Sequence, residues 1–261
     1  MNEVLINIEN LSCSYEKGFE LKNISCKFCR GELCGIIGPN GSGKTTLIKA
    51  ATGLMKIKSG SIEIEGKNLK SLSPSHIAQK IAVVMQENNY LLEMNVLDYV
   101  LLGRIPYRKS FSFMPLKNDI KIAVEMLSKC GIANFANRNI SELSGGERQL
   151  THIARALTQN PQIIFLDEPT NHLDLAHQHQ IMNLLKSLAE NEFICVVVVI
   201  HDLNLAGRFC KKLYLMNNGE LISSGTPNEI LIPNILEEVY KVKIAIQTDN
   251  INQKPLIFTP L

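Results

Sequence analysis

The stretch that decides the fold is Gly38-Pro39-Asn40-Gly41-Ser42-Gly43-Lys44-Thr45, followed by a second threonine, Thr46. An apolar run at 33–37 precedes it with the length of a buried strand, and residues 45–51 have the pattern of a helix. Strand, glycine-rich turn and helix start are the context in which this spacing forms a phosphate-binding loop. The glycines let backbone N–H groups turn toward an anion, and the helix N-terminus adds partial positive charge. We therefore expect this protein to bind a nucleoside triphosphate.

Two side chains of this loop have predicted roles. Lys44 is expected to reach the β- and γ-phosphates, and Thr45 Oγ is placed to ligate Mg²⁺. The alternative is a glycine-rich turn without a ligand. That alternative leaves unexplained why all the fixed positions are filled between a strand and a helix.

Length and composition are ordinary for a globular α/β protein. The 261 residues suffice for one large domain with its own core. Apolar residues make up 45%, charged residues 20%, and the net charge of +2 gives no reason to propose nucleic acid as a partner. The longest apolar run, residues 193–200, is too short to span a membrane, and the N-terminus does not resemble a signal peptide. We expect a cytosolic chain.

The seven cysteines leave two interpretations open. Cys26 and Cys29 form a CxxC that, with Cys34, could hold zinc or an iron–sulfur cluster. Against this, no second CxxC or histidine pair follows at finger-like spacing. Cys26 and Cys34 also interrupt apolar strand patterns, where cysteine serves as a small hydrophobe. We favour reduced structural thiols.

The chain before the loop predicts an antiparallel β layer. Residues 4–8 and 11–15 are predicted as two strands joined at Glu9-Asn10, and residues 19–28 as a third. Tyr15 ends the second strand. Its ring is either a platform for an adenine base or a tyrosine at a strand edge.

The chain after the loop helix alternates between strands and helices and then changes character. Ser73-Pro74 begins a short predicted helix, and the apolar strand 81–85 ends at Gln86, which can ligate Mg²⁺, hold water or be a plain loop residue. Residues 96–102 and 120–129 have helical spacing. The aromatic loop at 105–115 between them is either a partner surface or packing on the helices. We expect an α-helical insertion at about residues 87–160.

A second anion site is predicted at Leu143-Ser144-Gly145-Gly146-Glu147-Arg148-Gln149. Ser144 is a suitable N-cap for the helix that follows. Gly145 and Gly146 leave the N–H groups at the helix start open to an anion.

Acidic and imidazole side chains follow two further strands. Residues 163–166 end in Asp167-Glu168, which suit a Mg²⁺-linked carboxylate followed by a general base. Residues 193–200 form a predicted strand that ends in His201-Asp202. Ligands of open α/β sheets lie at the carboxyl ends of the strands, so these residues, Gln86 and the loop are expected to share one site.

In order and spacing these residues resemble the ATP-binding subunits of ABC transporters over nearly the whole chain. The corresponding motifs are the Walker A loop Gly38–Thr45, the Q-loop Gln86, the signature Leu143–Glu147, the Walker B Asp167 with Glu168, the D-loop Asn171–Asp174 and the switch His201. The signature carries Glu147 where many members have glutamine. The resemblance implies a P-loop NTPase (RecA-like) α/β core with a mainly parallel sheet, an N-terminal antiparallel β subdomain and the inserted α-helical subdomain. Residues 1–242 would form this domain, and 243–261 a short β tail packed on it.

The resemblance also implies roles for the site residues, with ATP and Mg²⁺ as cofactors. Glu168 and His201 would be catalytic, and Thr45, Gln86 and Asp167 would hold the metal. The nucleotide would lie among Tyr15, Gly38, Pro39, Asn40, Gly41, Ser42, Gly43, Lys44, Thr45, Thr46, Gln86, Ser144, Gly145, Gly146, Asp167 and Asp174. Because members form head-to-tail dimers, Ser144 and Gly146 of one copy would contact the γ-phosphate held by Lys44 of the other.

A finer resemblance is to the importers of iron–siderophore, heme and cobalamin chelates. The segments that carry it are Val96–Arg104, Thr170–Asp174 with His177-Gln178, His201–Ala206, Gly225–Pro227 and Leu236–Tyr240. Related members import molybdate or tungstate, and an exporter subunit or a soluble ABC ATPase are further alternatives. The resemblance implies a peripheral protein on the cytoplasmic face of the cell membrane.

Its implied partners are an integral membrane permease and, indirectly, a periplasmic or extracytoplasmic substrate-binding protein. We expect residues 87–106 to form the groove for the permease's cytoplasmic helix, with Leu91, Leu92 and Met94 near its floor. The alternative is that these three side chains only pack the insertion onto the core.

Overall fold

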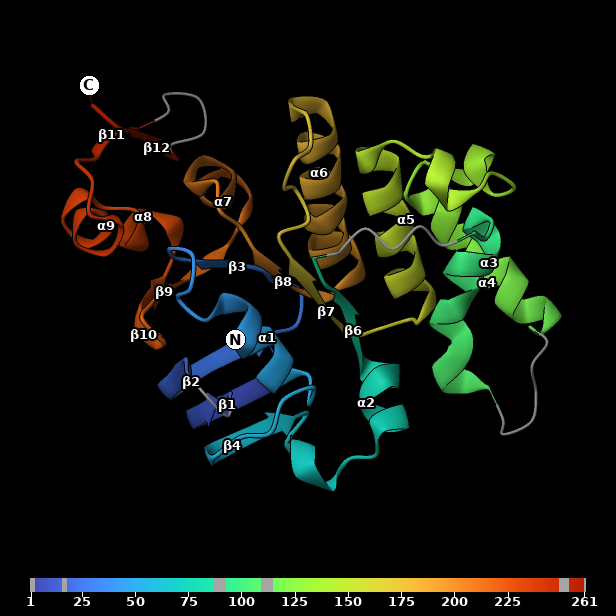
Figure 1. Ribbon diagram of the computed structural model, residues 1–261, viewed down its shortest axis with the longest axis horizontal. Coiled ribbons are helices and arrows are strands. Elements are labelled where there is room, and N and C mark those ends of the chain that lie inside the picture. The colour runs from blue at the N-terminus through green and yellow to red at the C-terminus, as the bar shows by residue number, and fades with distance from the viewer. Residues whose placement is uncertain (1–2, 16–17, 87–92, 109–114, 249–253, 261) are drawn as a thin grey trace.

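The protein is described by a computed structural model, which covers residues 3–15, 18–86, 93–108, 115–248 and 254–260 (Figure 1). Its centre is a six-stranded sheet in the order β10-β9-β3-β8-β7-β6. The strands are β3 (Leu33–Ile37), β6 (Ile81–Val84), β7 (Ile163–Asp167), β8 (Cys195–Val199), β9 (Lys212–Asn217) and β10 (Glu220–Gly225). Neighbours pair in parallel except β10, which pairs antiparallel with β9. The predicted mainly parallel sheet is confirmed.

Both faces of the inner strands β3, β7 and β8 are buried, which explains why these strands are nearly continuous apolar runs, whereas the edge strand β10 alternates between exposed and half-buried residues. Successive side chains of a strand point to opposite faces. On β3, Cys34 and Ile36 belong to one core and Leu33 and Ile37 to the other. The first core lies between the sheet, helix α1 (Lys44–Ala51) and the N-terminal β layer, and the second lies under the remaining helices.

The N-terminal layer is a four-stranded antiparallel sheet, as predicted. Its strands are β1 (Val4–Ser14), β2 (Glu20–Cys29), β4 (Ser59–Ile64) and β5 (Lys67–Asn68) in the order β2-β1-β4-β5. The predicted division into two strands at Glu9-Asn10 is wrong, because β1 is continuous. Asn10 has φ 48° and the pairing with β2 shifts register between Ile8 and Leu11, so a bulge takes the place of the turn.

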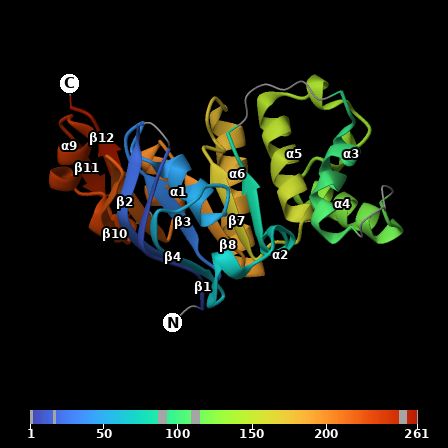
Figure 2. The same cartoon turned by 60° about the horizontal axis from the view of Figure 1, so that its bottom comes forward.

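The helices lie on both sides of the central sheet. They are α1, α2 (Pro74–Lys80), α3 (Val96–Leu101), α4 (Lys117–Lys129), α5 (Gly145–Thr158), α6 (Leu175–Glu192), α7 (Leu203–Phe209), α8 (Pro227–Ile230) and α9 (Pro233–Tyr240). Helices α3, α4 and α5 gather beyond the β6 edge, and α8 and α9 lie beyond the opposite edge (Figures 1 and 2). None of the helices in the described part of the chain is long and apolar enough to cross a membrane.

The segment after α3 is a 3₁₀ helix over Leu102–Tyr107, so the predicted loop begins later than residue 105. Arg104 is buried there, pairs with Asp119 at 2.9 Å and stacks on the ring of Tyr107. Tyr107 donates to the carbonyl of Gln159 at 2.9 Å, so this aromatic residue packs on the helices. Phe111 and Phe113 lie outside the described residues.

The cysteines occupy apolar surroundings. Cys13, Cys26, Cys34, Cys130, Cys195 and Cys210 are buried, and Cys29 is half-buried. Burial raises the pKa of Cys26 to about 12. The positions of Cys26 and Cys34 agree with their prediction as small apolar residues in strands.

The chain beyond α9 ends in a two-stranded antiparallel hairpin, β11 (Ala245–Thr248) and β12 (Pro255–Phe258). Asn204 on α7 holds it through both polar atoms of its amide. Its Nδ2 donates to the carbonyl of Ile257 at 3.2 Å, and its Oδ1 accepts from the amide of Ile257 at 2.8 Å. The division of the chain at residue 242 stays our proposal.

Candidate nucleotide site

The glycine-rich loop connects β3 to α1 at the carboxyl end of the strand. Gly43 is the N-cap of α1 with φ 104°, and a Cβ there would lie 2.5 Å from Leu21 Cδ2. Gly38 has φ 146°, and a Cβ there would lie 2.1 Å from the carbonyl oxygen of Met216. Both positions therefore require glycine. The helix starts without a side-chain cap, which leaves its first N–H groups for an anion.

Lys44 is buried and its ammonium group holds the loop in shape. Lys44 Nζ donates to the carbonyl of Gly38 at 2.8 Å and to that of Pro39 at 2.9 Å. Burial lowers the pKa of Lys44, while the nearby carboxylates of Glu168 and Asp167 act to raise it. The ammonium therefore lies inside the loop, where a phosphate bound to the backbone N–H groups would meet it.

Thr45 and Asp167 meet at the ends of neighbouring elements, α1 and β7. Thr45 Oγ1 donates to Asp167 Oδ2 at 2.7 Å. The other carboxylate oxygen, Asp167 Oδ1, is buried and has no hydrogen-bond partner among the described residues. Burial raises the pKa of Asp167, the bond from Thr45 lowers it, and Lys44 acts in the same direction as Thr45. A buried carboxylate with an unpaired oxygen beside a hydroxyl fits a hard divalent cation such as Mg²⁺.

Glu168 lies one residue further on and is the centre of a hydrogen-bond network. Gln86 Nε2 donates to Glu168 Oε2 at 3.1 Å, and Asn171 Nδ2 donates to the same oxygen at 3.0 Å. His201 Nε2 lies 2.5 Å from Glu168 Oε1. Glu168 has φ 53°, a left-handed conformation that is uncommon for non-glycine residues. The predicted meeting of the strand ends at Gln86, Glu168 and His201 is therefore present.

Tyr15 lies beside the loop. With eight other residues it lines a cavity of about 240 Å³, and its side chain is 44% exposed. Lys49 Nζ lies 3.4 Å from its hydroxyl. The lining comprises Tyr15, Phe19, Asn40, Gly41, Gly43, Lys44, Thr45, Thr46 and Glu168. A half-exposed ring at the mouth of a phosphate-binding loop suits a stacked base.

The other loop residues support this arrangement. The carbonyl of Pro39 accepts from the amide of Ser42 at 3.2 Å. Ser42 Oγ is buried and lacks a hydrogen-bond partner within the described part of the chain.

The second predicted anion site lies at the N-terminus of α5, apart from the Lys44 pocket. Ser144 is the N-cap, as predicted, and accepts from the amide of Glu147 at 3.3 Å. Glu147 Oε2 accepts from the amide of Ser144 at 2.8 Å, which completes a capping box. These hydrogen bonds lower the pKa of Glu147. Gly145, Gly146 and Asp174 belong to the same group of residues around the start of α5, which we call the second cluster.

Our sequence reasoning assigned no individual role to three residues at the site. Asn171 bonds to Glu168, Phe19 lines the cavity, and His177 contacts Asp174 and Gly146. Asn171 and His177 lie in segments on which the family resemblance rests. Only their tertiary contacts distinguish their roles from those of the neighbouring residues.

Known proteins are similar to this chain in sequence. The ABC transporter family profile matches residues 21–171. The uncharacterized ABC transporter ATP-binding protein YvrA of Bacillus subtilis is 36% identical over 249 residues, which cover 95% of this chain and 56% of YvrA. The iron(3+)-hydroxamate import ATP-binding protein FhuC of Bacillus subtilis is 34% identical over 254 residues, covering 97% of this chain and 94% of FhuC. The cobalamin import ATP-binding protein BtuD of Halobacterium salinarum is 34% identical over 229 residues, 88% of this chain and 57% of BtuD. The chain therefore spans just over half of YvrA and BtuD.

Solved structures agree. A chain from a structure described as an inward-facing, metal-chelate type ABC transporter superposes with a TM-score of 0.86 at 28% identity, covering 99% of this chain and 97% of that one. The dimeric ABC transporter cassette MJ0796 has a TM-score of 0.74 at 34% identity, covering 85% of this chain and 98% of that one.

The strand–loop–helix unit, the carboxylates of Asp167 and Glu168 at the end of β7 and the loop glycines that leave no room for a side chain define a P-loop nucleotide-binding protein. The chain belongs to the ABC transporter family, as an ATP-binding and ATP-hydrolysing cassette.

Proposed function

We propose that this chain is the ATPase subunit of an importer for a metal chelate, such as an iron–siderophore, heme or cobalamin. It would act as a head-to-tail dimer beneath a permease on the cytoplasmic face of the cell membrane, with a substrate-binding protein delivering the chelate. FhuC and BtuD are named as import ATP-binding proteins, which supports the importer class. The match to FhuC covers 94% of that protein. Molybdate or tungstate import remains the alternative substrate class. Exporter and soluble ATPase functions rank below it.

One observation supports ATP hydrolysis at this site: three side chains converge on the carboxylate of Glu168. Gln86, Asn171 and His201 all hydrogen-bond Glu168 at the end of β7. This network aims Glu168 toward the loop, where the carboxylate accepts a proton from the attacking water. His201 contacts Oε1 of this carboxylate, whereas Gln86 and Asn171 donate to Oε2.

Binding is divided among the loop residues. The backbone N–H groups of the loop and Lys44 would hold the phosphates, and Tyr15 would support the base. Thr45, Asp167 and Gln86 would hold Mg²⁺, which neutralises phosphate charge when bound. Asp167 offers the unpaired buried oxygen for this purpose.

The dimer accounts for the second cluster. Ser144 and Gly146 lie at a helix start that can bind an anion, yet they do not line the pocket of Lys44. A second copy placed head to tail would bring its γ-phosphate to them. The relative MJ0796 forms a dimer, which supports the association of two copies.

The test of the importer function is uptake. The chain is reconstituted with its permease in vesicles, with ATP inside the compartment that the chain faces, and entry of a radiolabelled iron–siderophore, cobalamin or molybdate is followed. ATP-dependent uptake of a chelate supports the proposal. Uptake of molybdate alone selects the alternative, and export of substrate would contradict both.

Tyr15→Ala should weaken ATP binding about 5- to 30-fold, because stacking of a base on this aromatic ring should contribute about 1–2 kcal/mol. A ring face carries no hydrogen-bond pattern, so GTP affinity should fall by a similar factor. Titration calorimetry with both nucleotides measures this, and Tyr15→Phe should bind normally. Unchanged affinity in Tyr15→Ala would leave Tyr15 as a strand-edge residue.

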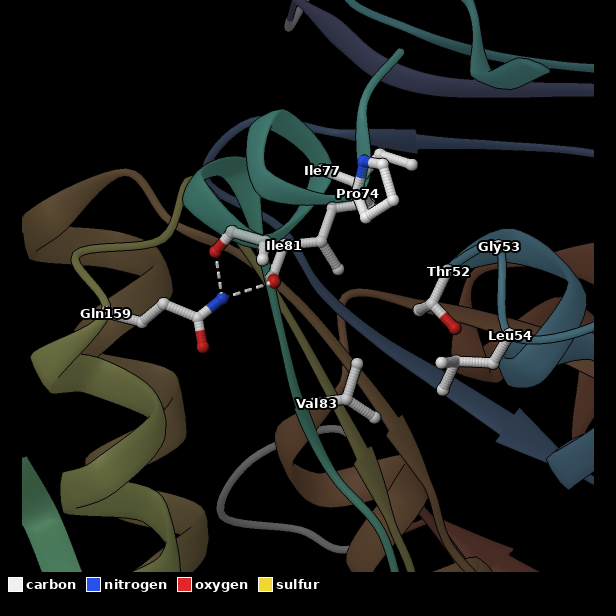
Figure 3. A pocket seen from close by; sticks show the side chains of 9 residues that line it. Thr52, Gly53, Leu54, Pro74, Ile77, Ile81, Val83 and Gln159 are labelled. Atoms are coloured by element: carbon white, nitrogen blue, oxygen red, sulfur yellow. Dashed lines mark hydrogen bonds between the residues drawn. The ribbon is translucent and has the colours of Figure 1, made fainter. Parts of the chain in front are cut away.

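We place the permease-binding groove more narrowly than residues 87–106, the range expected from the sequence. Residues 87–92, including Leu91 and Leu92, lie outside the described chain, and Met94 packs against the core. A neighbouring apolar groove of about 370 Å³ runs between the end of α1, α2, β6 and the end of α5 (Figure 3). Leu54, Ile77 and Val83 contribute its apolar walls.

The position of this groove suits coupling. Gln79 on α2 donates to the carbonyl of Pro106 at 2.9 Å, so the groove adjoins the end of the predicted docking segment. Gln159 Nε2, at the end of α5, donates to the carbonyl of Ile81 at 2.6 Å on one side of the groove, with Thr52 and Leu54 on the other side (Figure 3). The walls of the groove thus belong both to the central sheet and to the helices beyond its β6 edge. A short apolar helix of the permease seated there would follow a relative movement of these two parts.

Leu54→Asp should abolish coupled uptake while ATP binding by the isolated subunit stays within about twofold of wild type, since Leu54 is 66% exposed and does not line the cavity beside the glycine-rich loop. Leu116→Asp is the matched control, because Leu116 is also 66% exposed but does not line the groove. Uptake in vesicles and pull-down of the permease are measured together. Wild-type uptake by Leu54→Asp with the permease bound would place docking elsewhere.

A further inference from the structure

His177, three residues beyond the N-cap of α6, connects the D-loop to the signature turn. Asp174 caps α6 by accepting from the amide of His177 at 2.8 Å. The ring Nδ1 of His177 lies 3.0 Å from Asp174 Oδ1 and 2.9 Å from Oδ2. An ionised carboxylate only accepts, so Nδ1 carries the proton and donates it to Asp174. The ring is thereby fixed to the last residue of the D-loop.

The same ring lies against the second glycine of the signature. A Cβ on Gly146 would be 2.2 Å from His177 Cδ2, 2.4 Å from Cγ and 2.8 Å from Nε2. These distances are far below carbon–carbon contact, so a side chain at 146 and the ring at 177 exclude each other. Gly146 is not among the glycines with positive φ, so it is needed for space and not for its backbone angles.

The neighbouring glycine provides a contrast. A Cβ on Gly145 would meet only Leu173 Cδ2, at 3.5 Å, which is ordinary contact. The tight packing is thus specific to Gly146 and His177. The turn that would face the partner's nucleotide rests on an imidazole ring that an acidic residue of the D-loop holds in place.

We propose that His177 is a positioning residue that holds the signature turn and the D-loop of one subunit as a single unit. The head-to-tail dimer would then bring both motifs to the partner's nucleotide in fixed register. This inference rests on the dimer of the proposed function. Without the ring, each motif would have to be ordered separately when the dimer closes, which weakens closure.

The first test measures ATP-dependent dimerisation in a Glu168→Gln background, by size-exclusion chromatography across protein concentrations. Adding His177→Ala should raise the dimer dissociation constant about 10-fold, the order expected when interface side chains that were held in place must be ordered on binding. The ATP affinity and melting temperature of the monomer should stay near those of the parent. His179→Ala is the matched control, since His179 lies on the same helix but packs on Phe209.

The second test is a double-mutant cycle between Gly146→Ala and His177→Ala. If the ring is what excludes a side chain at 146, Gly146→Ala will weaken dimerisation less in the His177→Ala protein than in its parent. Equal losses in both backgrounds would overturn the contact.

The outcomes separate the inference from the function on which it rests. A Glu168→Gln protein that never dimerises with ATP would defeat the proposed dimer. A dimerising parent whose His177→Ala variant dimerises equally well would defeat the positioning role alone.

Discussion

Glu168→Gln should slow ATP hydrolysis by about 10²–10⁴-fold, the usual contribution of a positioned general base. The amide cannot accept the proton of the attacking water. Its oxygen can still accept from Gln86 or Asn171, so the shape of the site should persist. ATP affinity is expected to stay near wild type, because the loop and Lys44 are untouched.

Slow hydrolysis with intact binding should trap an ATP-bound dimer. Single-turnover hydrolysis and size-exclusion chromatography measure the two effects on one preparation. Glu190→Gln serves as the control, because Glu190 lies on the surface of α6 with its side chain 59% exposed. A Glu168→Gln protein that hydrolyses ATP near the wild-type rate would show that another residue is the base.

The parts of the site that could be predicted are those that lie at strand ends. Asp167, Glu168 and His201 each follow an uninterrupted apolar strand, and parallel strands bring their carboxyl ends to one edge of a sheet. The continuous apolar runs also predicted buried strands, and β3 is such a strand, with side chains in both cores. In these cases local pattern and tertiary position coincide.

The parts that could not be predicted depend on contacts between distant segments. Glu9-Asn10 has the composition of a turn. Pairing with β2 on one side and with β4 on the other nevertheless keeps β1 continuous, with a bulge at this point. The 3₁₀ helix at Leu102–Tyr107 contains Arg104, which pairs with the buried carboxylate of Asp119 on α4, a contact that local sequence does not report. The contact of His177 with Gly146 joins two helix starts that are far apart in the chain, and no periodicity reports it.

Lys44→Ala should reduce ATP affinity by at least about 100-fold, because it removes a cation that would make charge-assisted hydrogen bonds worth about 1.5–3 kcal/mol each. The structure adds a second cause. Lys44 Nζ bonds the carbonyls of Gly38 and Pro39, so the loop also loses the group that holds its curvature. An anion would then meet a loop with less positive charge and less order.

The effect on folding should be small, because two contributions oppose each other. The variant loses two hydrogen bonds, but it no longer buries an ammonium group whose pKa burial lowers. Circular dichroism and the melting temperature without nucleotide should therefore match wild type, and Lys56→Ala, at an exposed lysine just after α1, should leave both binding and folding unchanged. Calorimetric titration with MgATP decides the result. Wild-type affinity in a folded Lys44→Ala protein would mean that the nucleotide binds somewhere other than this loop.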